Sequence, residues 1–336
     1  MDNLNVRFFV GDAREKLRGK DAKSLAVFHT GITVAAALVI TLLQFVLAEG
    51  IGNTSGLSGL GTRSVLETIQ TVLHWANMIL VPFWGLGFLY ASLLWSQNRY
   101  ARREDLLMGF RRFGPFLSLL LNRSVLAILV MILCGHLSSA AFMLTPAAGS
   151  FMELVEVEGA DMEALNQMMA QMSWEDTMAL ANSLLPMLII WGVLSLVILV
   201  PLLNRFRLAE YVILDEPLAR GLSSMLISAA LLRRRCWKLF RLDLQFWWYY
   251  GLKLLCTLLC YGDLLLGILG VNLPIGGEVA SLITYGLYLA ALFAIEVTFR
   301  PQVDTAYAGL FLALKEMGPE QKRAPAVPQN MPWDEE

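Results

Sequence analysis

The sequence predicts an all-α protein, a polytopic membrane helical bundle with six transmembrane helices and additional interfacial amphipathic helices. The first observation is composition. Of the 336 residues, 57% are hydrophobic and only 16% are charged, and the mean hydropathy is +0.58. Soluble domains have about 45–50% apolar and about 25% charged residues, so a large soluble core does not account for this chain. The second observation is that apolar residues gather in long runs, and the third is that Lys and Arg alternate between the connections.

Six apolar runs reach the length of about 20 residues that a bilayer requires. They are 25–48, 71–95, 124–145, 184–203, 244–269 and 279–299. We start the third run at Ser124, because a start at Phe116 would place Asn122 and Arg123 inside the membrane. Residues 113–122 are therefore predicted to be an interfacial lead-in.

The distribution of Lys and Arg predicts how the chain crosses the membrane. Six basic residues precede the first run, five lie in the connection 96–122, eight lie in the connection 204–243, and four follow from Arg300. The other three connections contain only Arg63. Cytoplasmic loops carry the Lys/Arg excess, so we expect both termini and both of these connections, or elbows, to be cytoplasmic. An even number of spans gives the same result.

Two domains follow from this pattern. Residues 1–303 are predicted to form an integral membrane domain, and residues 304–336 a cytoplasmic tail that is mostly disordered at its end. That end is rich in proline, which favours disorder.

The connection 146–181 is predicted to lie outside, because it has no Lys or Arg and carries seven acidic residues. Within it, residues 158–178 favour an amphipathic helix with one apolar face: Met162, Leu165, Met169 and Met172. Thioethers are soft ligands, so a copper(I) site is one interpretation. An apolar face resting on lipid or on other helices is the preferred one, because no Cys or His accompanies the methionines.

The elbow 204–243 contains the most unusual segment, "DEPLARGLSSMLISAALLRRRCWKLFRLDLQFWWYY" (215–250). Asp215-Glu216-Pro217 is typical of a helix start, since proline is tolerated at the first helical position. Apolar residues then recur at helical spacing: Leu218, Leu222, Met225, Ala229 and Leu232. We expect an amphipathic helix lying in the membrane interface. The predicted interfacial anchors, which would bind anionic headgroups or set the depth of the fifth span, are Arg233, Arg234, Arg235, Lys238, Arg241, Trp247 and Trp248.

Residues 99–121 have a similar basic and amphipathic plan and also precede an outward span. The two span–elbow–span units suggest a parallel internal repeat of the kind found in transporters. Chance similarity of two basic loops explains the likeness equally well.

Three segments together resemble the domain of unknown function 975 family, membrane proteins found mostly in Gram-positive bacteria. They are "AREKLRGKDAKSLA", "DLLMGFRRF" and, above all, "EYVILDEPLARGLSSMLISAALLRRRCWKLFRLDLQFW". The family's Tyr–x–hydrophobic–x–Asp–x–Pro start is matched by Tyr211, Asp215 and Pro217. Its "hLFxLxLSF" segment is matched by "KLFRLDLQF", although Asp243 and Gln245 depart from it, and the triple arginine replaces a Lys- and Gly-containing turn. The resemblance covers most of residues 12–300. It implies a multi-helix protein of a bacterial cell membrane and assigns no catalytic residue.

Ionisable residues within the spans are candidates for function. Lys253, Glu296 and His29 lie near span ends, where a position at the membrane edge explains them. Asp263 lies deeper, thirteen residues after Tyr250, or about 20 Å along a helix. His136 lies equally far from the start of a parallel span, so we hypothesise an Asp263–His136 pair as a polar lock or proton-responsive site.

Enzyme motifs such as HExxH, GxSxG and the P-loop are missing from the sequence, and the four cysteines form no CxxC pair. We therefore expect no enzyme, no cofactor, no bound metal and no nucleic-acid partner. The expected function is a non-enzymatic one, through contacts with the lipid bilayer or with a membrane protein partner. The alternative is a small-molecule or ion transporter or channel with a polar site near Asp263.

Overall fold

The computed structural model describes residues 6–53, 60–145, 148–149, 174–233, 235–260 and 277–318. All regular structure within these ranges is helical, which confirms the predicted all-α class. Five stretches are long and apolar enough to cross a membrane, by length and composition: Ala22–Leu47, Arg63–Ser96, Phe113–Phe142, Leu184–Asp215 and Ile283–Met317. This is the helix composition of a multi-pass membrane protein.

Four of the six predicted spans lie wholly within long helices. These helices are α2 (Ala22–Asn53), α3 (Leu60–Ser96), α8 (Trp174–Arg205) and α14 (Gly277–Met317). The predicted span 244–269 is described only in part, as helix α12 (Trp247–Cys260), and its remainder lies outside the described residues. The count of six spans therefore stays a prediction.

The third predicted span lies in helix α5 (Phe113–Phe142), which begins earlier than the sequence indicated. Its 30 residues are continuous, so residues 113–122 do not form a separate lead-in. Asn122 does not interrupt the helix, because its side-chain amide donates to the carbonyl of Ser118 one turn earlier, at 2.7 Å. At about 1.5 Å per residue the helix is about 45 Å long, well beyond a bilayer core of about 30 Å.

The chain divides into two compact units. The smaller unit, Ser118–Arg207, contains most of α5 and α8. These helices are joined by side chain–backbone bonds, with Ser138 Oγ donating to the Met187 carbonyl at 2.7 Å and Trp191 Nε1 to the Met131 carbonyl at 3.4 Å. Buried hydroxyl and indole groups need such partners, so these bonds fix how the two helices face each other.

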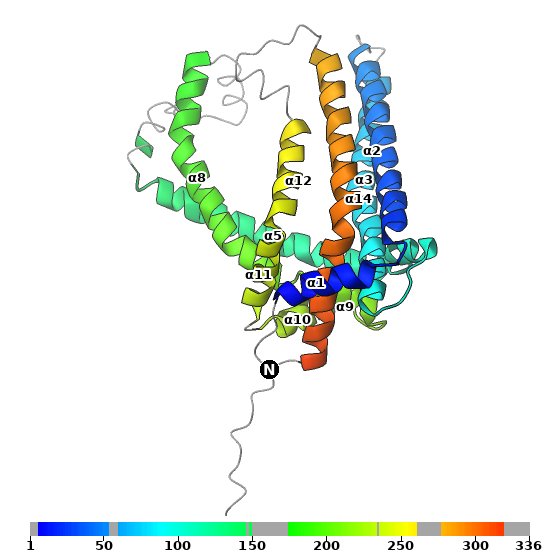
Figure 1. Ribbon diagram of the computed structural model, residues 1–336. Coiled ribbons are helices and arrows are strands. Elements are labelled where there is room, and N and C mark those ends of the chain that lie inside the picture. The colour runs from blue at the N-terminus through cyan, green and yellow to red at the C-terminus, as the bar shows by residue number, and fades with distance from the viewer. Residues whose placement is uncertain are drawn as a thin grey trace, which may run out of the picture. The chain divides into compact units, whose positions relative to one another are not determined.

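The larger unit, Met1–Leu117 with Leu208–Glu336, contains the other helices. Within it α2, α3 and α14 run side by side, and α12 packs against α14 (Figure 1). Buried alanines along α2 and α3, such as Ala26 and Ala91, let the two helices approach closely around Phe88 and Trp95.

Four short helices lie at one end of this unit and surround the C-terminal part of α14 (Figure 1). We call them the base helices: α1 (Val6–Leu17), α9 (Ala209–Asp215), α10 (Gly221–Leu231) and α11 (Cys236–Gln245). The part of α14 among them is buried, including Tyr307, Phe311 and Leu314. Helix α14 thus continues past the predicted tail boundary at residue 303, because these apolar side chains have a core to fill, and the domain division itself stays a prediction.

A tight contact joins α3 to the first elbow, which forms helices η2 (Arg103–Leu107) and α4 (Met108–Arg111). A Cβ atom on Gly87 would overlap the backbone of Leu106, and one on Gly109 would overlap the carbonyl of Phe83. The two glycines let backbones touch where any side chain would separate them. Next to them, Phe83 is fully buried and stacks on Phe113 with centroids 4.6 Å apart.

The second elbow corrects the sequence interpretation of Asp215-Glu216-Pro217 as a helix start. Helix α9 ends at Asp215, and Glu216 has an extended backbone with φ −107° and ψ 111°. A proline disfavours the helical conformation of the residue before it, so Pro217 ends one helix and does not begin the next. Helix α10 begins at Gly221, with the N–H of Arg220 donating to Ser223 Oγ at 2.8 Å.

The predicted apolar face of this helix is divided between two environments. Met225 and Leu232 are buried, whereas Leu218 is 94% and Leu222 is 59% exposed. The buried side also takes small serines such as Ser224, whose hydroxyl donates to the carbonyl of Gly221 at 2.7 Å. The buried face of α10 thus combines large apolar side chains with small serines.

Candidate functional site

The described residues do not include both members of the predicted intramembrane pair, Asp263 and His136. Asp263 lies outside the described residues, and His136 has an exposed side chain on α5. The Asp263–His136 pair therefore stays a prediction, as does a transporter or channel built on it. The Met-rich segment with Met162, Met169 and Met172 also lies outside the described residues.

The predicted basic anchors have different environments. Arg233 and Arg241 are exposed, and the Arg241 guanidinium lies 5.7 Å from the centroid of the Trp237 ring. Arg235 is partly buried, since it donates to the carbonyl of Gly318 at 3.2 Å, and Lys238 is also partly buried. Arg234 lies outside the described residues.

The two predicted tryptophan anchors also differ. Trp247 is 68% exposed. Trp248 packs edge-on against Phe299 of α14, with ring centroids 4.6 Å apart. Trp247 is therefore the more exposed of the two, whereas Trp248 is partly buried and joins α12 to α14.

A group of charged side chains meets at α14, and two of its members, Glu296 and Lys253, were placed near span ends by sequence reasoning. Glu296, only 6% exposed, accepts bonds from two residues of α12. Lys253 Nζ lies 2.7 Å from Glu296 Oε1, and the Tyr249 hydroxyl donates to the same oxygen at 3.1 Å. The other carboxylate oxygen lies 3.3 Å from Nη1 of Arg300.

Arg300 extends this group along one face of α14. Its Nε lies 3.1 Å from Asp304 Oδ2, so the guanidinium stands between two carboxylates, four residues to either side. It also lies over the Phe88 ring of α3, 4.8 Å from the centroid. We call Lys253, Glu296, Arg300 and Asp304 the charged network. Its two cations and two anions balance, which is the condition under which buried charges are tolerated.

Further hydrogen bonds connect the same part of α14 to three other helices. The Tyr211 hydroxyl of α9 donates to the Asp304 carbonyl at 3.1 Å, and Ser96 Oγ of α3 to the Thr305 carbonyl at 3.2 Å. The Tyr307 hydroxyl donates to the carboxylate of Asp243 on α11. The charged network and these bonds thus gather α3, α9, α11 and α12 around α14.

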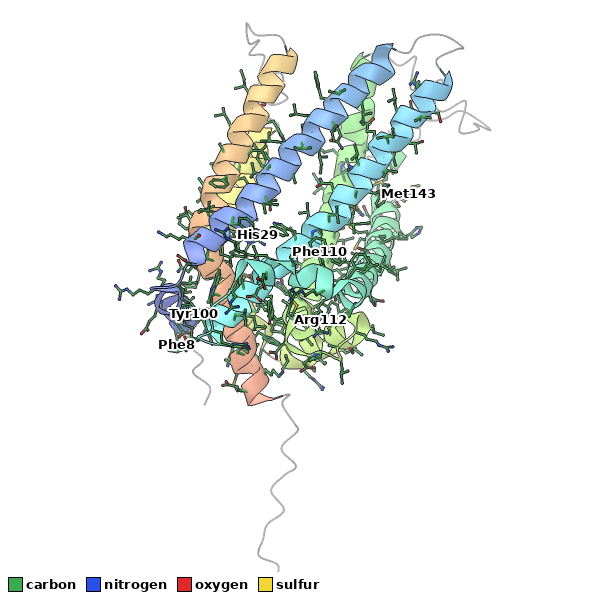
Figure 2. All side chains as sticks on the ribbon, turned by 90° about the vertical axis from the view of Figure 1, so that its right-hand side faces the viewer. Phe8, His29, Tyr100, Phe110, Arg112 and Met143 are labelled. Atoms are coloured by element: carbon green, nitrogen blue, oxygen red, sulfur yellow. The ribbon has the colours of Figure 1, made fainter. Side chains whose placement is uncertain are left out.

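His29 forms a separate junction between α2 and α3. Its ring stacks on the Trp84 ring, with centroids 5.1 Å apart and planes inclined by 6°. His29 Nε2 donates to the Trp84 carbonyl and Trp84 Nε1 donates to the His29 carbonyl, both at 3.2 Å. His29 lies toward the end of α2 nearest the base helices (Figure 2). A structural contact therefore explains this buried histidine better than a position at the membrane edge.

The first elbow contacts the second near the base. Arg112 Nη1 donates to the carbonyl of Pro217 at 2.7 Å. Figure 2 shows Arg112 at the end of the unit where the base helices lie. Close by, Lys315 forms ion pairs with Asp215 at 2.6 Å and Glu216 at 3.2 Å. These contacts hold the turn after α9 against the end of α14.

Lys20, which precedes α2, donates to the carbonyl of Trp95 at 3.2 Å. Partial burial, followed by the repulsion of Lys16, lowers the pKa of Lys20 from its ordinary value of 10.5. The bond fixes the chain entering α2 against the end of α3.

Within the described residues, no group of three or more His, Cys, Asp or Glu side chains could hold a metal ion. The sequence signal for the charged network was the spacing of Glu296, Arg300 and Asp304, which places alternating charges on one helix face. That signal gave no indication that Lys253 would meet them, because the pairing spans two helices.

No family model, no curated protein and no solved structure matches this chain. The resemblance to the domain of unknown function 975 family therefore stays a prediction from its motifs.

Proposed function

We propose that this chain is a non-enzymatic protein of a bacterial cytoplasmic membrane that acts through its base helices, which contact anionic lipid headgroups. In this proposal the base helices and both termini lie on the cytoplasmic side, as the distribution of Lys and Arg indicates. The observation that carries it is an exposed apolar and basic surface on α10 and α11.

The apolar part of this surface consists of large side chains at helical spacing. On the α10 side Leu218, Leu222 and Leu226 are 94%, 59% and 63% exposed. On α11 Trp237 and Leu244 are 59% and 50% exposed. So many large apolar side chains are unfavourable in water, and they are favourable at the boundary between headgroups and acyl chains. We call this set, together with Arg233 and Arg241, the α10–α11 surface.

The basic part selects the kind of lipid. Arg233 and Arg241 are both exposed, and the Arg241 guanidinium lies 5.7 Å from the centroid of the Trp237 ring. A basic residue near an anionic leaflet contributes about 1 kcal/mol, so the two arginines together contribute about 2 kcal/mol. A tryptophan beside an arginine suits the interface, since the ring enters the headgroup layer while the guanidinium binds phosphate.

The proposal is tested by the thermal stability of the purified protein in neutral detergent, with added phosphatidylglycerol or phosphatidylcholine. We expect phosphatidylglycerol to raise the melting temperature more than phosphatidylcholine does. The double variant R233Q/R241Q should lose most of that difference.

The matched control is Arg63→Gln, which removes an equally charged and exposed arginine from the pair Arg63–Glu67. It should keep the response to phosphatidylglycerol. Equal responses to both lipids in the unmodified protein, or an unchanged response in the double variant, would overturn the proposal.

A further inference from the structure

The charged network surrounds a proline inside a long helix. Pro301 lies within α14, between Arg300 and Asp304. Proline has no N–H, so the carbonyl of Val297 lacks the helical donor it would otherwise have. Sharp bends of helices occur mostly at such positions. The side chain of Arg300 crosses this weak point, because it pairs with Glu296 before the proline and Asp304 after it.

The segment after Pro301 is held by hydrogen bonds to α9 and α3 and, at its end, by the ion pairs of Lys315. The carbonyls of Asp304 and Thr305 accept from Tyr211 and Ser96, which are both 4% exposed. These bonds come from buried donors and join the lower part of α14 to α9 and α3.

The segment before Pro301 is held differently. Glu296 is bound to α12 by Lys253 and Tyr249. The side chain of Lys253 is 42% exposed, whereas that of Glu296 is 8% exposed. A lysine on a flexible stem can turn its ammonium group outward to water or headgroups, but the carboxylate cannot follow it. Glu296 therefore stays in place, whereas the ammonium group of Lys253 can move away from it.

We propose that the Lys253–Glu296 ion pair is a releasable latch, which holds α12 against α14 when closed and lets α14 bend at Pro301 when open. This goes beyond the lipid contact, since it depends on other residues. When Lys253 leaves, Glu296 keeps Arg300 of the same helix as a partner, so the open state contains no isolated buried charge. The open state is thus accessible without unfolding the larger unit.

The experiment measures the distance between α12 and the part of α14 before Pro301. Leu254 and Leu287, which are 64% and 59% exposed, are replaced by cysteine and spin-labelled. The native cysteines are first replaced by serine: Cys134, Cys236, Cys256 and Cys260. Double electron–electron resonance in lipid nanodiscs then gives the distribution of distances between the two labels.

Three variants separate charge from packing. Lys253→Met removes the charge, and we expect the ratio of longer to shorter distances to rise about fivefold, as for loss of a partly exposed ion pair. Lys253→Arg keeps the charge and should give the unmodified distribution. Tyr249→Phe removes a hydrogen bond to the same Glu296 oxygen and should also leave the distribution closed. Lys253→Gln replaces Lys253→Met if the latter gives too little folded protein.

The proposal is overturned by any of three results. In the first, Lys253→Met or Lys253→Gln has the distribution of the unmodified protein, so the charge holds nothing. In the second, Lys253→Arg opens as far as Lys253→Met, so side-chain shape matters and charge does not. In the third, Tyr249→Phe opens equally far, so the hydrogen bond holds the helices.

Discussion

Replacing Arg300 by methionine tests whether the charged network stabilises the fold as a unit. The substitution keeps much of the apolar stem but removes the only cation that touches both Glu296 and Asp304 in the described contacts. Breaking a buried pair by removing one partner costs about 3–5 kcal/mol. Glu296 would keep Lys253 and Tyr249, so the cost falls at the lower end, and loss of the contact with Phe88 adds about 0.5–1 kcal/mol. We expect Arg300→Met to lower the free energy of unfolding by about 3–4 kcal/mol.

The assay is reversible unfolding in mixed micelles, with sodium dodecyl sulfate added as denaturant and tryptophan fluorescence as the signal. A double variant, R300M/D304N, gives the decisive comparison. In Arg300→Met the Asp304 carboxylate has lost its ion-pair partner, and the second substitution removes the charge of that carboxylate. The double variant should recover at least about 1 kcal/mol relative to Arg300→Met alone. Arg63→Met, in an exposed ion pair of α3, should cost less than about 1 kcal/mol. A cost below about 1 kcal/mol for Arg300→Met, or no recovery in the double variant, would refute the reasoning.

Three further predictions use the same unfolding assay or nuclear magnetic resonance. Gly87→Ala should cost about 1–3 kcal/mol, because the new methyl group overlaps the backbone of the first elbow; Gly114→Ala, with open space around it, should cost less than about 0.5 kcal/mol. Tyr307→Phe should cost about 1–3 kcal/mol by leaving Asp243 without this donor, and an unchanged stability would contradict that bond. Side-chain resonances of Lys20 should titrate below 10.5, because burial and a nearby cation lower its pKa. The unfolded chain then holds this proton more tightly, so this residue's contribution to stability rises as pH passes upward through the folded pKa.

The long apolar runs could be predicted from the sequence because length and hydropathy are properties of one segment. The runs 25–48 and 184–203 lie inside helices α2 and α8 for this reason. The predicted ends of the helices were less accurate than their positions. The sequence interpretation ended the sixth span at residue 299, where charges begin, but α14 continues to Met317, and apolar side chains of this part, such as Phe311 and Leu314, are buried.

The candidate site could not be predicted in the same way, because it depends on which helices meet. Glu296 near a span end looks like a residue at the membrane edge until Lys253 and Tyr249 are known to face it. The local rules at Asp215-Glu216-Pro217 also conflicted, since an acidic residue followed by proline suits a helix start and the same proline suits a helix end. The preceding helix α9 decides between them, because it buries Val212 and Ile213 and extends to Asp215.

The reciprocal bonds between His29 and Trp84 have a mechanical consequence. Each helix supplies one donor and one acceptor to the other at the same position along the helix axes. The His29 and Trp84 rings are also stacked nearly parallel. Sliding α2 along α3 by one helical turn, about 5.4 Å, would break both bonds and the stacking together. The two helices therefore share one fixed register and form a rigid pair. When α14 bends, it moves relative to this pair, and α2 and α3 stay in place.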